Sequence, residues 1–170
     1  MEEAVVFTKG VSETFVFFCK LSEPNRWFSN WYPSNFLADG KLFSSVEQYM
    51  MWSKACLMGD HEIARMVMEA EAPAAIKALG RKVKNYDEGL WGRERRRVVY
   101  EGCLAKFQQD GVLRQKLLAT GKAALVEAAS YDKIWGVGLG KQDARILDRK
   151  TWLGENLLGE VLMDVRAHLV

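Results

Sequence analysis

Apolar side chains follow a helical period between Ser44 and Met58, and this stretch carries the strongest helix signal in the chain. At about 100° per residue, one face of the predicted helix carries no charged side chain. Its members are Val46, Tyr49, Met50 and Leu57, with Cys56 at the edge. Trp52 lies on the far side of the same helix, which favours a helix enclosed by protein on nearly all sides.

Two opposite charges, Glu47 and Lys54, interrupt the apolar character of this helix. They share a stripe with Met51 and Met58 at the spacing i, i+4, i+7 and i+11. Two turns separate the two charges, roughly 10 Å along the axis, so their long side chains can reach a common volume. Because an isolated buried ion costs many kcal/mol, we expect these charges either to pair or to face a wet pocket.

Structural interpretations compete with a functional role for both residues. Ser44 and Glu47 have the spacing of a capping box, in which the glutamate only bonds the helix N-terminus. Ser45 and Gln48 fit the same motif one residue later and would release Glu47, and the sequence does not decide between these registers. Lys54 also fits a surface lysine that lays its stem along the helix.

Three segments have the composition of strands. Residues 4–19 contain two β-branched and aromatic runs, which indicate two strands or one hairpin. In residues 34–43, Asp39-Gly40 supplies the positive φ values of a type I′ turn, so we predict a second hairpin there. Residues 122–129 fit either a strand or a helix, because their alanines blur the period.

The remaining segments predict amphipathic helices at residues 61–71, 73–80, 90–109, 112–119 and at the C-terminus. Asp60, Pro73 and Gly80 supply a cap, a first turn and a helix end. The expected inward positions are Ile63, Met66, Val67, Ala70, Val98, Val99, Leu104, Phe107, Leu157, Leu158, Val161, Leu162, Val165 and Leu169. We therefore predict an α+β fold: a single compact, mostly helical domain around a small β-sheet, spanning residues 1–170.

A loop from Leu21 to Pro33 concentrates aromatic rings among polar side chains. The rings are Trp27, Phe28, Trp31 and Tyr32, and the polar side chains between them are Arg26, Ser29 and Asn30. Flat rings beside hydrogen-bonding groups suit a nucleobase or the edge of a sugar, and Asn30 is the strongest candidate for a ligand contact. A wedge of rings that closes one end of a sheet is an equally weighted alternative.

Composition narrows the chemistry. The 170 residues are 49% hydrophobic and 27% charged, which suits one domain with a core. No segment approaches the roughly 18 apolar residues of a membrane span, and the acidic start lacks a signal peptide, so we expect a cytoplasmic protein with no membrane partner. Three widely spaced cysteines and two histidines show no metal-ligand spacing, so we expect neither a metal nor a cofactor.

Positive charge concentrates in residues 77–97. Eight basic and three acidic side chains give this segment a net charge of +5, against −3 for the rest of a chain whose total is +2. Arg93, Arg96 and Arg97 are expected to begin a helix, where cations oppose the macrodipole, and this favours a bound anion such as a phosphate. The nearby acidic side chains that would neutralise them instead are Asp87, Glu88 and Glu94.

An acid and an indole, Asp132 and Trp135, precede a run of alternating glycines. The glycines are Gly136, Gly138 and Gly140. Glycines at this density let the backbone approach a ligand, although the spacing is not that of a phosphate loop. For Asp132 a turn-forming role, in which the carboxylate bonds the backbone just ahead, is the favoured structural alternative.

Six blocks of sequence, taken in order, cover nearly the whole chain. They are WFSNWYP, DGKLFSSVEQYMMWSKA, LGRKV, the spacing from Trp91 to Lys106-Phe107, LLATGKAALVEAASYDKIWGVGL and GENLLGEVLMDVR. Together they resemble the NADAR or YbiA-like family of N-glycosidases. Some members of this family cleave ribosylamino-pyrimidine phosphates of the riboflavin pathway, and others remove ADP-ribose from guanine bases modified by DNA ADP-ribosyltransferases. The resemblance implies a YbiA-like fold and a hydrolase that acts on N-glycosyl bonds.

The resemblance also implies roles for individual residues. Glu47 and Asp132 are the expected catalytic acids, and Lys54 matches the lysine that closes the family's helix motif. The implied substrate-binding residues are Arg26, Phe28, Ser29, Asn30, Trp91, Arg93, Trp135 and Gly136. Trp31 stands where phenylalanine is common, and the basic run at 93–97 is a second departure, so the substrate could differ while the chemistry stays.

N-glycoside cleavage suits these residue types. The reaction develops positive charge on the ribose ring and negative charge on the departing nitrogen. A carboxylate near the anomeric carbon, from Glu47 or Asp132, would stabilise the cation or orient water. In a second route, a neutral Lys54 amine attacks that carbon and holds the opened sugar as an imine until water releases it. Both routes stay open here.

Four functions follow as hypotheses. The first is a metal-independent N-glycosidase that removes ADP-ribose from guanine in nucleic acid, because a basic patch suits both a diphosphate and DNA. Its expected partners are ADP-ribosylated DNA and a DNA ADP-ribosyltransferase toxin, against which the chain would be the antitoxin. The second acts on ribosylamine phosphates of the riboflavin pathway. The third is a non-catalytic reader of ADP-ribose or NAD, and the fourth is a plain nucleic-acid binder.

Overall fold

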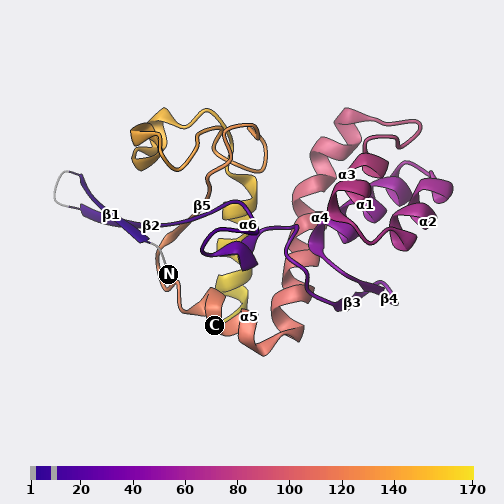
Figure 1. The fold of residues 1–170 in the computed structure, drawn as a ribbon, viewed down its shortest axis with the longest axis horizontal. Helices are drawn as coiled ribbons and strands as arrows, with labels where there is room; N and C mark the ends of the chain where they lie inside the picture. Colours follow the sequence, from indigo (N-terminus) through magenta and orange to yellow (C-terminus); the bar gives the residue numbers. More distant parts are fainter. Residues whose placement is uncertain (1–2, 9–10) are drawn as a thin grey trace. The chain divides into compact units, whose positions relative to one another are not determined.

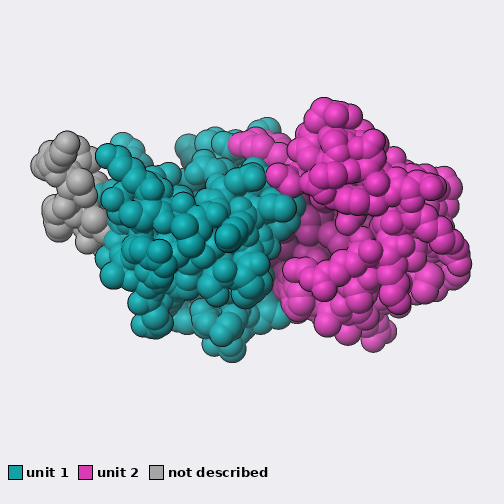
Figure 2. Space-filling model, turned by 90° about the horizontal axis from the view of Figure 1, so that it is seen from above, with its two compact units in different colours: residues 1–29, 112–170 teal, residues 30–111 magenta. Residues whose placement is uncertain are grey.

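The structure is a computed structural model that describes residues 3–8 and 11–170. The chain divides into two compact units, which we describe separately. Unit 1 comprises residues 1–29 and 112–170, and unit 2 comprises residues 30–111 (Figure 2). Helices and a few short strands make up both units, which confirms the α+β class, whereas the predicted single domain over residues 1–170 stays a prediction.

Unit 1 contains a three-stranded sheet in the order β1-β2-β5 (Figure 1). β1 (Glu3–Thr8) pairs antiparallel with β2 (Val11–Phe18), so of the two alternatives left open for residues 4–19, two strands or one hairpin, the pairing favours the hairpin. Residues 9 and 10, which follow β1 in the sequence, lie outside the described residues. β5 (Ala124–Glu127) pairs parallel with β2, which shows that the ambiguous alanine-containing segment is a strand.

One helix, α6 (Leu157–Leu169), packs against β5. Its buried residues are Leu158, Gly159, Val161, Leu162, Val165 and Leu169. Leu157 was also expected to face inward, but it is only half-buried because its position is the first of the helix. Unit 1 also contains all of α5 (Gly111–Leu118) except its first residue, and the short helices η1 (Arg26–Phe28), η2 (Ala144–Leu147) and η3 (Arg149–Thr151).

The sheet of unit 1 contributes aromatic and branched side chains to a buried cluster. Its buried members are Phe15, Phe17, Ala124, Val126, Ala128, Val137, Leu139 and Ile146. Burying one large apolar side chain contributes about 1.5–3 kcal/mol. Because Val137 and Leu139 belong to this cluster, it packs the strands against the glycine-containing segment that follows Asp132.

Unit 2 begins with the second hairpin, formed by β3 (Phe36–Ala38) and β4 (Lys41–Phe43). Asp39 and Gly40 have φ values of 48° and 69°, so the predicted type I′ turn is confirmed. Four helices follow the hairpin: α1 (Val46–Leu57), α2 (His61–Glu69), α3 (Pro73–Gly80) and α4 (Glu88–Gln109). α1 is central, because α2, α3 and α4 all contact it.

In α2, the hydrophobic periodicity predicted one inward position wrongly. Asp60 caps α2 as predicted, since its carboxylate accepts from Ile63 N at 3.1 Å. Met66 was expected to face inward but is 37% exposed. α2 buries only a narrow stripe of Ile63, Ala64 and Val67, and Met66 lies about 100° of helix rotation from the middle of that stripe.

The helix α4 is long but too highly charged to resemble a membrane span. α4, the longest, has 22 residues and carries a dense set of charges. Within residues 3–8 and 11–170, no helix has both the length and the apolar character that crossing a bilayer requires.

Candidate functional site

The N-terminus of α1 resolves the choice between the two capping registers. Ser45 is the N-cap, and its hydroxyl accepts from Gln48 N at 3.2 Å. Gln48 Oε1 accepts from Ser44 N at 2.8 Å, and Gln48 Nε2 donates to Val67 O in α2 at 3.0 Å. The later register therefore forms, and Gln48 rather than Glu47 supplies the carbonyl that bonds the chain before the helix.

Glu47 lies beside the end of the aromatic loop. Its side chain is 2% exposed, and its backbone N–H donates to Asn30 O at 2.9 Å. Asn30 is also buried, and its Oδ1 lies 3.9 Å from Cys103 Sγ in α4. Because the backbone of Asn30 is bonded to the first turn of α1, two of the expected site residues are held together in unit 2.

Lys54 lies two turns further along α1 in an aromatic surrounding. Its Nζ donates to Gly80 O at 2.8 Å, at the end of α3. The same Nζ lies 4.5 Å from the ring centroid of Tyr86 and 5.8 Å from that of Trp91. Trp91 is itself buried. The ammonium group is therefore held by a carbonyl and two π faces, so Lys54 is not a surface lysine lying along its own helix.

Burial makes the ammonium group of Lys54 easier to deprotonate. Loss of hydration lowers the pKa of Lys54 from 10.5, and the positive charge of Arg81 lowers it further. The carboxylates of Glu88 and Glu47 act in the opposite direction, since they stabilise the ammonium form. Lys54 thus responds to the charge of Glu47, and a larger share of its amine is neutral than in an exposed lysine.

The stripe shared by these two residues is closed in by apolar side chains. We call Glu47, Met51, Lys54 and Met58 the acid–amine stripe. Met51 and Met58 are 7% and 8% exposed, and all residues from 46 to 58 are at least partly buried. Every residue of α1 is therefore at least partly buried, as expected of a helix enclosed by protein, although the face that carries Trp52 also borders a hollow.

The arginines of α4 differ from their expected place. α4 begins at Glu88, with Asp87 as the cap that accepts from Leu90 N at 2.9 Å, so Arg93 lies in the second turn. Arg96 and Arg97 lie in the third turn. The macrodipole acts mainly over the first turn, so the expectation of an anion bound at the N-terminus through these arginines is not supported. The polar residues that precede these arginines suit a helix cap, and this explains why α4 begins earlier in the sequence than predicted.

Some of these arginines are neutralised by nearby carboxylates, as the alternative interpretation held. Arg97 bonds Glu94 at 2.8 Å and Glu101 at 2.7 Å. Arg95 lies 3.8 Å from Glu88. Exposed ion pairs of this kind contribute about 0–1 kcal/mol, so their main effect is to reduce the positive field of the segment.

In unit 1, the carboxylate of Asp132 forms a turn. Its Oδ1 accepts from Ile134 N at 2.9 Å and from Trp135 N at 2.8 Å. Gly138 follows with φ at 68°, a value that favours glycine. The turn-forming interpretation of Asp132 therefore describes its Oδ1 contacts, and the same contacts fix the direction of the half-buried carboxylate.

The aromatic loop divides between packing and more open positions. Phe28 is 1% exposed, and its ring centroid lies 5.7 Å from that of Phe18 and 6.0 Å from that of Trp27. Trp27 is half-buried, with Lys116 Nζ 4.1 Å from its ring. The Phe28 ring is therefore part of a packed aromatic wedge, whereas Arg26 is exposed.

The expected site residues fall in both units. Those in unit 1 are Arg26, Phe28, Ser29, Asp132, Trp135 and Gly136. Those in unit 2 are Asn30, Glu47, Lys54, Trp91 and Arg93. Within unit 2 the structure brings Asn30 to Glu47 and Lys54 to Trp91, and within unit 1 it brings Asp132 to Trp135. A site that combines both sets stays a prediction.

A buried lysine in α4, Lys106, was not among the expected site residues. It is 1% exposed, and its Nζ lies 5.3 Å from the Tyr32 ring and 5.1 Å from the Phe107 ring. Burial lowers its pKa to about 8, although Cys103 and Asp110 favour the charged form. Its position seven residues after Val99, an expected inward position, was the signal available in the sequence, because that spacing returns to the same face of the helix.

We expect the pH dependence of stability to report on Lys106. Between pH 8 and 10.5 the folded protein has released a proton that the unfolded chain still binds, so stability rises with pH across this window. The rise is about 3 kcal/mol, and the variant Lys106→Met, which has nothing to titrate, should lack it. Urea unfolding of both proteins at pH 7 to 10.5 measures it, and a difference in stability that stays constant over that range would refute the shift.

The opposite face of α1 borders a separate hollow of about 630 Å³. Tyr49, Trp52 and Cys56 line it from α1, and Glu101 lines it from α4. The Tyr49 hydroxyl lies 3.1 Å from Asp39 Oδ2 and 3.3 Å from Glu101 Oε2, and burial raises the pKa of Tyr49. This hollow and the acid–amine stripe are therefore different places on the same helix.

Comparison with known proteins connects these features to a family. A family model of the NADAR domain matches residues 17–170. N-glycosidase R617 of Acanthamoeba polyphaga mimivirus is 43% identical, over 82% of this chain and 85% of that protein. Protein irg-1 of Caenorhabditis elegans is 42% identical, over 84% of this chain and 74% of that protein.

A solved structure agrees with these sequence similarities. The NMR structure of the Escherichia coli protein YbiA matches with a TM-score of 0.75 at 28% identity, over 91% of this chain and 84% of that chain. The E. coli relative carries the name N-glycosidase YbiA. The family match covers nearly the whole sequence, with the helix of the acid–amine stripe inside it, and the chain therefore belongs to the NADAR domain family.

Proposed function

We propose that this chain is an N-glycosidase that removes ADP-ribose from modified guanine bases in nucleic acid. The observation that carries the proposal is the acid–amine stripe, in which a buried carboxylate and an amine of lowered pKa share one side of α1. Relatives named N-glycosidase in a virus and a bacterium support the reaction class. Metal is not required by either route below, since carboxylate and amine groups supply the charges.

In the first route, a carboxylate stabilises the sugar cation. As the bond between ribose C1 and the base nitrogen breaks, its electron pair moves to the nitrogen, and positive charge spreads over C1 and the ring oxygen. Glu47 is suited to face this charge, because its buried carboxylate interacts with it at low dielectric. Asp132, held by two backbone N–H groups, is the second candidate, to orient water or to supply a proton.

In the second route, Lys54 is a nucleophile. Its neutral amine attacks C1, the C1–N bond breaks, and the base leaves with the electron pair and takes up a proton. The new amine gives one proton to the departing base and its second proton to the ring oxygen as the sugar ring opens, which leaves an imine. Water then hydrolyses the imine to release the sugar and restore Lys54. The lowered pKa supports this route, and the two rings that hold Nζ reduce its freedom before attack.

The surface charge supports a nucleic-acid-bound substrate. Residues 77–97 carry a net charge of +5, and Arg81, Lys82, Arg93 and Arg96 are exposed. Exposed cations attract a phosphate backbone as well as the diphosphate of ADP-ribose. The runner-up substrates, ribosylamine phosphates of the riboflavin pathway, are small and would use less of this surface. A non-catalytic reader of ADP-ribose or NAD is the candidate of another class.

Substrate cleavage distinguishes these functions. The protein is incubated separately with an ADP-ribosylated guanine oligonucleotide and with a ribosylamino-pyrimidine phosphate, and the released sugar is measured by chromatography. We expect release of ADP-ribose from the oligonucleotide. Cleavage of only the small substrate would favour the runner-up, and binding of ADP-ribose without cleavage of either would favour the reader.

A further inference from the structure

The loop that carries Asp132 is bound along its length to the segment that begins α6. In this segment, five backbone N–H groups donate to five carbonyls of the loop at 2.9–3.1 Å. The donors are Leu153, Glu155, Asn156, Leu157 and Leu158, and their respective acceptors are Val137, Lys133, Gly136, Ile134 and Trp135. Because Leu157 and Leu158 begin α6, two of these bonds also satisfy N–H groups that a helix cannot satisfy internally.

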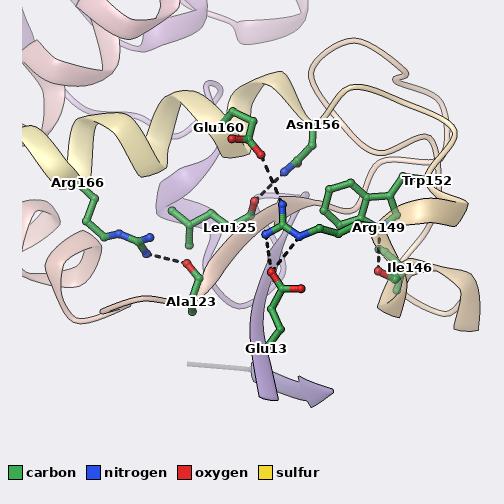
Figure 3. Close-up of polar contacts among 9 residues, drawn as sticks. All are labelled: Glu13, Ala123, Leu125, Ile146, Arg149, Trp152, Asn156, Glu160 and Arg166. Carbon is green, nitrogen blue, oxygen red and sulfur yellow. Dashed lines mark hydrogen bonds and ion pairs between the residues drawn. The ribbon is translucent and has the colours of Figure 1, made fainter. Parts of the chain in front are cut away.

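Asn156 anchors this segment to the sheet (Figure 3). Its side chain is fully buried, Nδ2 donates to Leu125 O at 2.9 Å, and Oδ1 accepts from Glu127 N at 3.0 Å. One side-chain amide therefore bonds two alternate backbone groups of β5, as a neighbouring strand would. Asn156 adopts φ at 54°, a left-handed conformation that asparagine tolerates better than most residues.

Three glycines lie where the backbones of the loop, α6 and β5 approach so closely that a side chain would collide with a neighbouring carbonyl. A Cβ atom at Gly154 would lie 2.4 Å from Gly136 O, and one at Gly159 would lie 2.1 Å from Leu125 O. A Cβ atom at Gly136 would lie 2.9 Å from Glu127 O. The loop, the start of α6 and β5 are thus in direct backbone contact, so a displacement of one moves the others.

The same loop determines the position of the Asp132 carboxylate. Oδ1 accepts from the N–H groups of Ile134 and Trp135, while the carbonyls in the same two peptide groups, those of Lys133 and Ile134, accept from Glu155 N and Leu157 N. Both sides of the peptide groups that orient Asp132 are therefore bonded. The chain of contacts runs from β5 through Asn156 to the loop and ends at Asp132 and Trp135.

We propose that Asn156 is the positioning residue of this loop, and that its two side-chain bonds to β5 hold Asp132 and Trp135 in their working geometry. The inference rests on the proposed function, in which Asp132 is a catalytic group. Asn156 itself acts through the loop and touches no substrate.

The test compares Asn156→Asp and Asn156→Gly with the unaltered protein. Asp keeps the shape and the Oδ1 acceptor but loses the donor to Leu125 O, whereas Gly keeps the left-handed backbone and loses both side-chain bonds. We expect the amides of Ile134 and Trp135 to exchange with deuterium about tenfold faster in both variants. With the oligonucleotide substrate we expect kcat to fall by about ten- to a hundredfold, because catalysis is sensitive to displacements near 1 Å.

Arg166→Met is the matched control for general destabilisation. Arg166 Nη1 donates to Ala123 O at 2.8 Å, so this change also removes a bond between α6 and the backbone beside β5, but at the far end of the helix (Figure 3). It should lower the unfolding midpoint without changing exchange of the loop or kcat, measured well below the midpoints of all variants. Unchanged loop exchange in both Asn156 variants, or an equal loss of kcat in Arg166→Met, would overturn the inference. If the unaltered protein cleaves nothing, the proposed function fails, and deuterium exchange alone decides the role of Asn156.

Discussion

Replacement of Glu47 by Gln should lower kcat by about 10³-fold while leaving affinity for ADP-ribose within a few-fold of the original. The amide keeps the shape of the side chain, which is 2% exposed, but removes the negative charge that would face the developing sugar cation. Because the capping bonds of α1 belong to Ser45 and Gln48, this substitution leaves the N-terminus of the helix intact. Steady-state cleavage of the oligonucleotide and calorimetric titration with ADP-ribose measure the two quantities.

Glu101→Gln is the control for this experiment. Glu101 is a half-buried carboxylate of the same unit, but it lies at the hollow on the opposite face of α1 and pairs with Arg97. Its amide variant should retain kcat within about twofold, because Glu101 lies away from the acid–amine stripe and its partly exposed pair with Arg97 contributes only about 0–1 kcal/mol to stability. A Glu47→Gln enzyme that cleaves at the original rate would remove Glu47 from the chemistry.

Reduction with borohydride during turnover should attach the opened sugar to Lys54. The imine route requires a neutral amine, so its rate should rise with pH up to the pKa of Lys54, which burial places below 10.5. Lys54→Arg keeps a cation near Tyr86 and Trp91 but cannot form the imine, and we expect it to lose about 10³-fold in kcat. Mass spectrometry of the peptide that contains Lys54 detects the adduct.

Lys41→Arg provides the comparison for the lysine experiment. Lys41 Nζ also lies near an aromatic ring, 6.0 Å from the centroid of Trp52, but its side chain is exposed in β4. It should neither form an adduct nor change the rate. Absence of any adduct on Lys54 under turnover would remove the imine route and leave direct hydrolysis.

Local signals in the sequence were sufficient for most elements of the fold. The Asp39-Gly40 turn, the cap at Asp60 and the helix from Pro73 to Gly80 were predicted because each depends on backbone preferences of a few adjacent residues. The exposure of Met66 was not predictable in this way. It depends on how wide a stripe α2 buries against its neighbours, which is set by tertiary packing.

The candidate site was predictable only in part, for a related reason. Periodicity places Glu47 and Lys54 on one stripe, because that follows from helix geometry alone. The choice of Gln48 for the capping bonds depends on its contacts with the end of α2, and the burial of Lys106 depends on the rings of Tyr32 and Phe107. The anchoring role of Asn156 likewise requires knowing that β5 lies beside α6.

The most direct test of the central claim is a crystal structure of the Glu47→Gln variant with ADP-ribose bound. We predict that the distal ribose lies against the acid–amine stripe, with its C1 atom within about 4 Å of the residue at position 47 or of Lys54 Nζ. ADP-ribose bound instead in the hollow lined by Tyr49 and Trp52 would contradict the claim that the acid–amine stripe carries the chemistry.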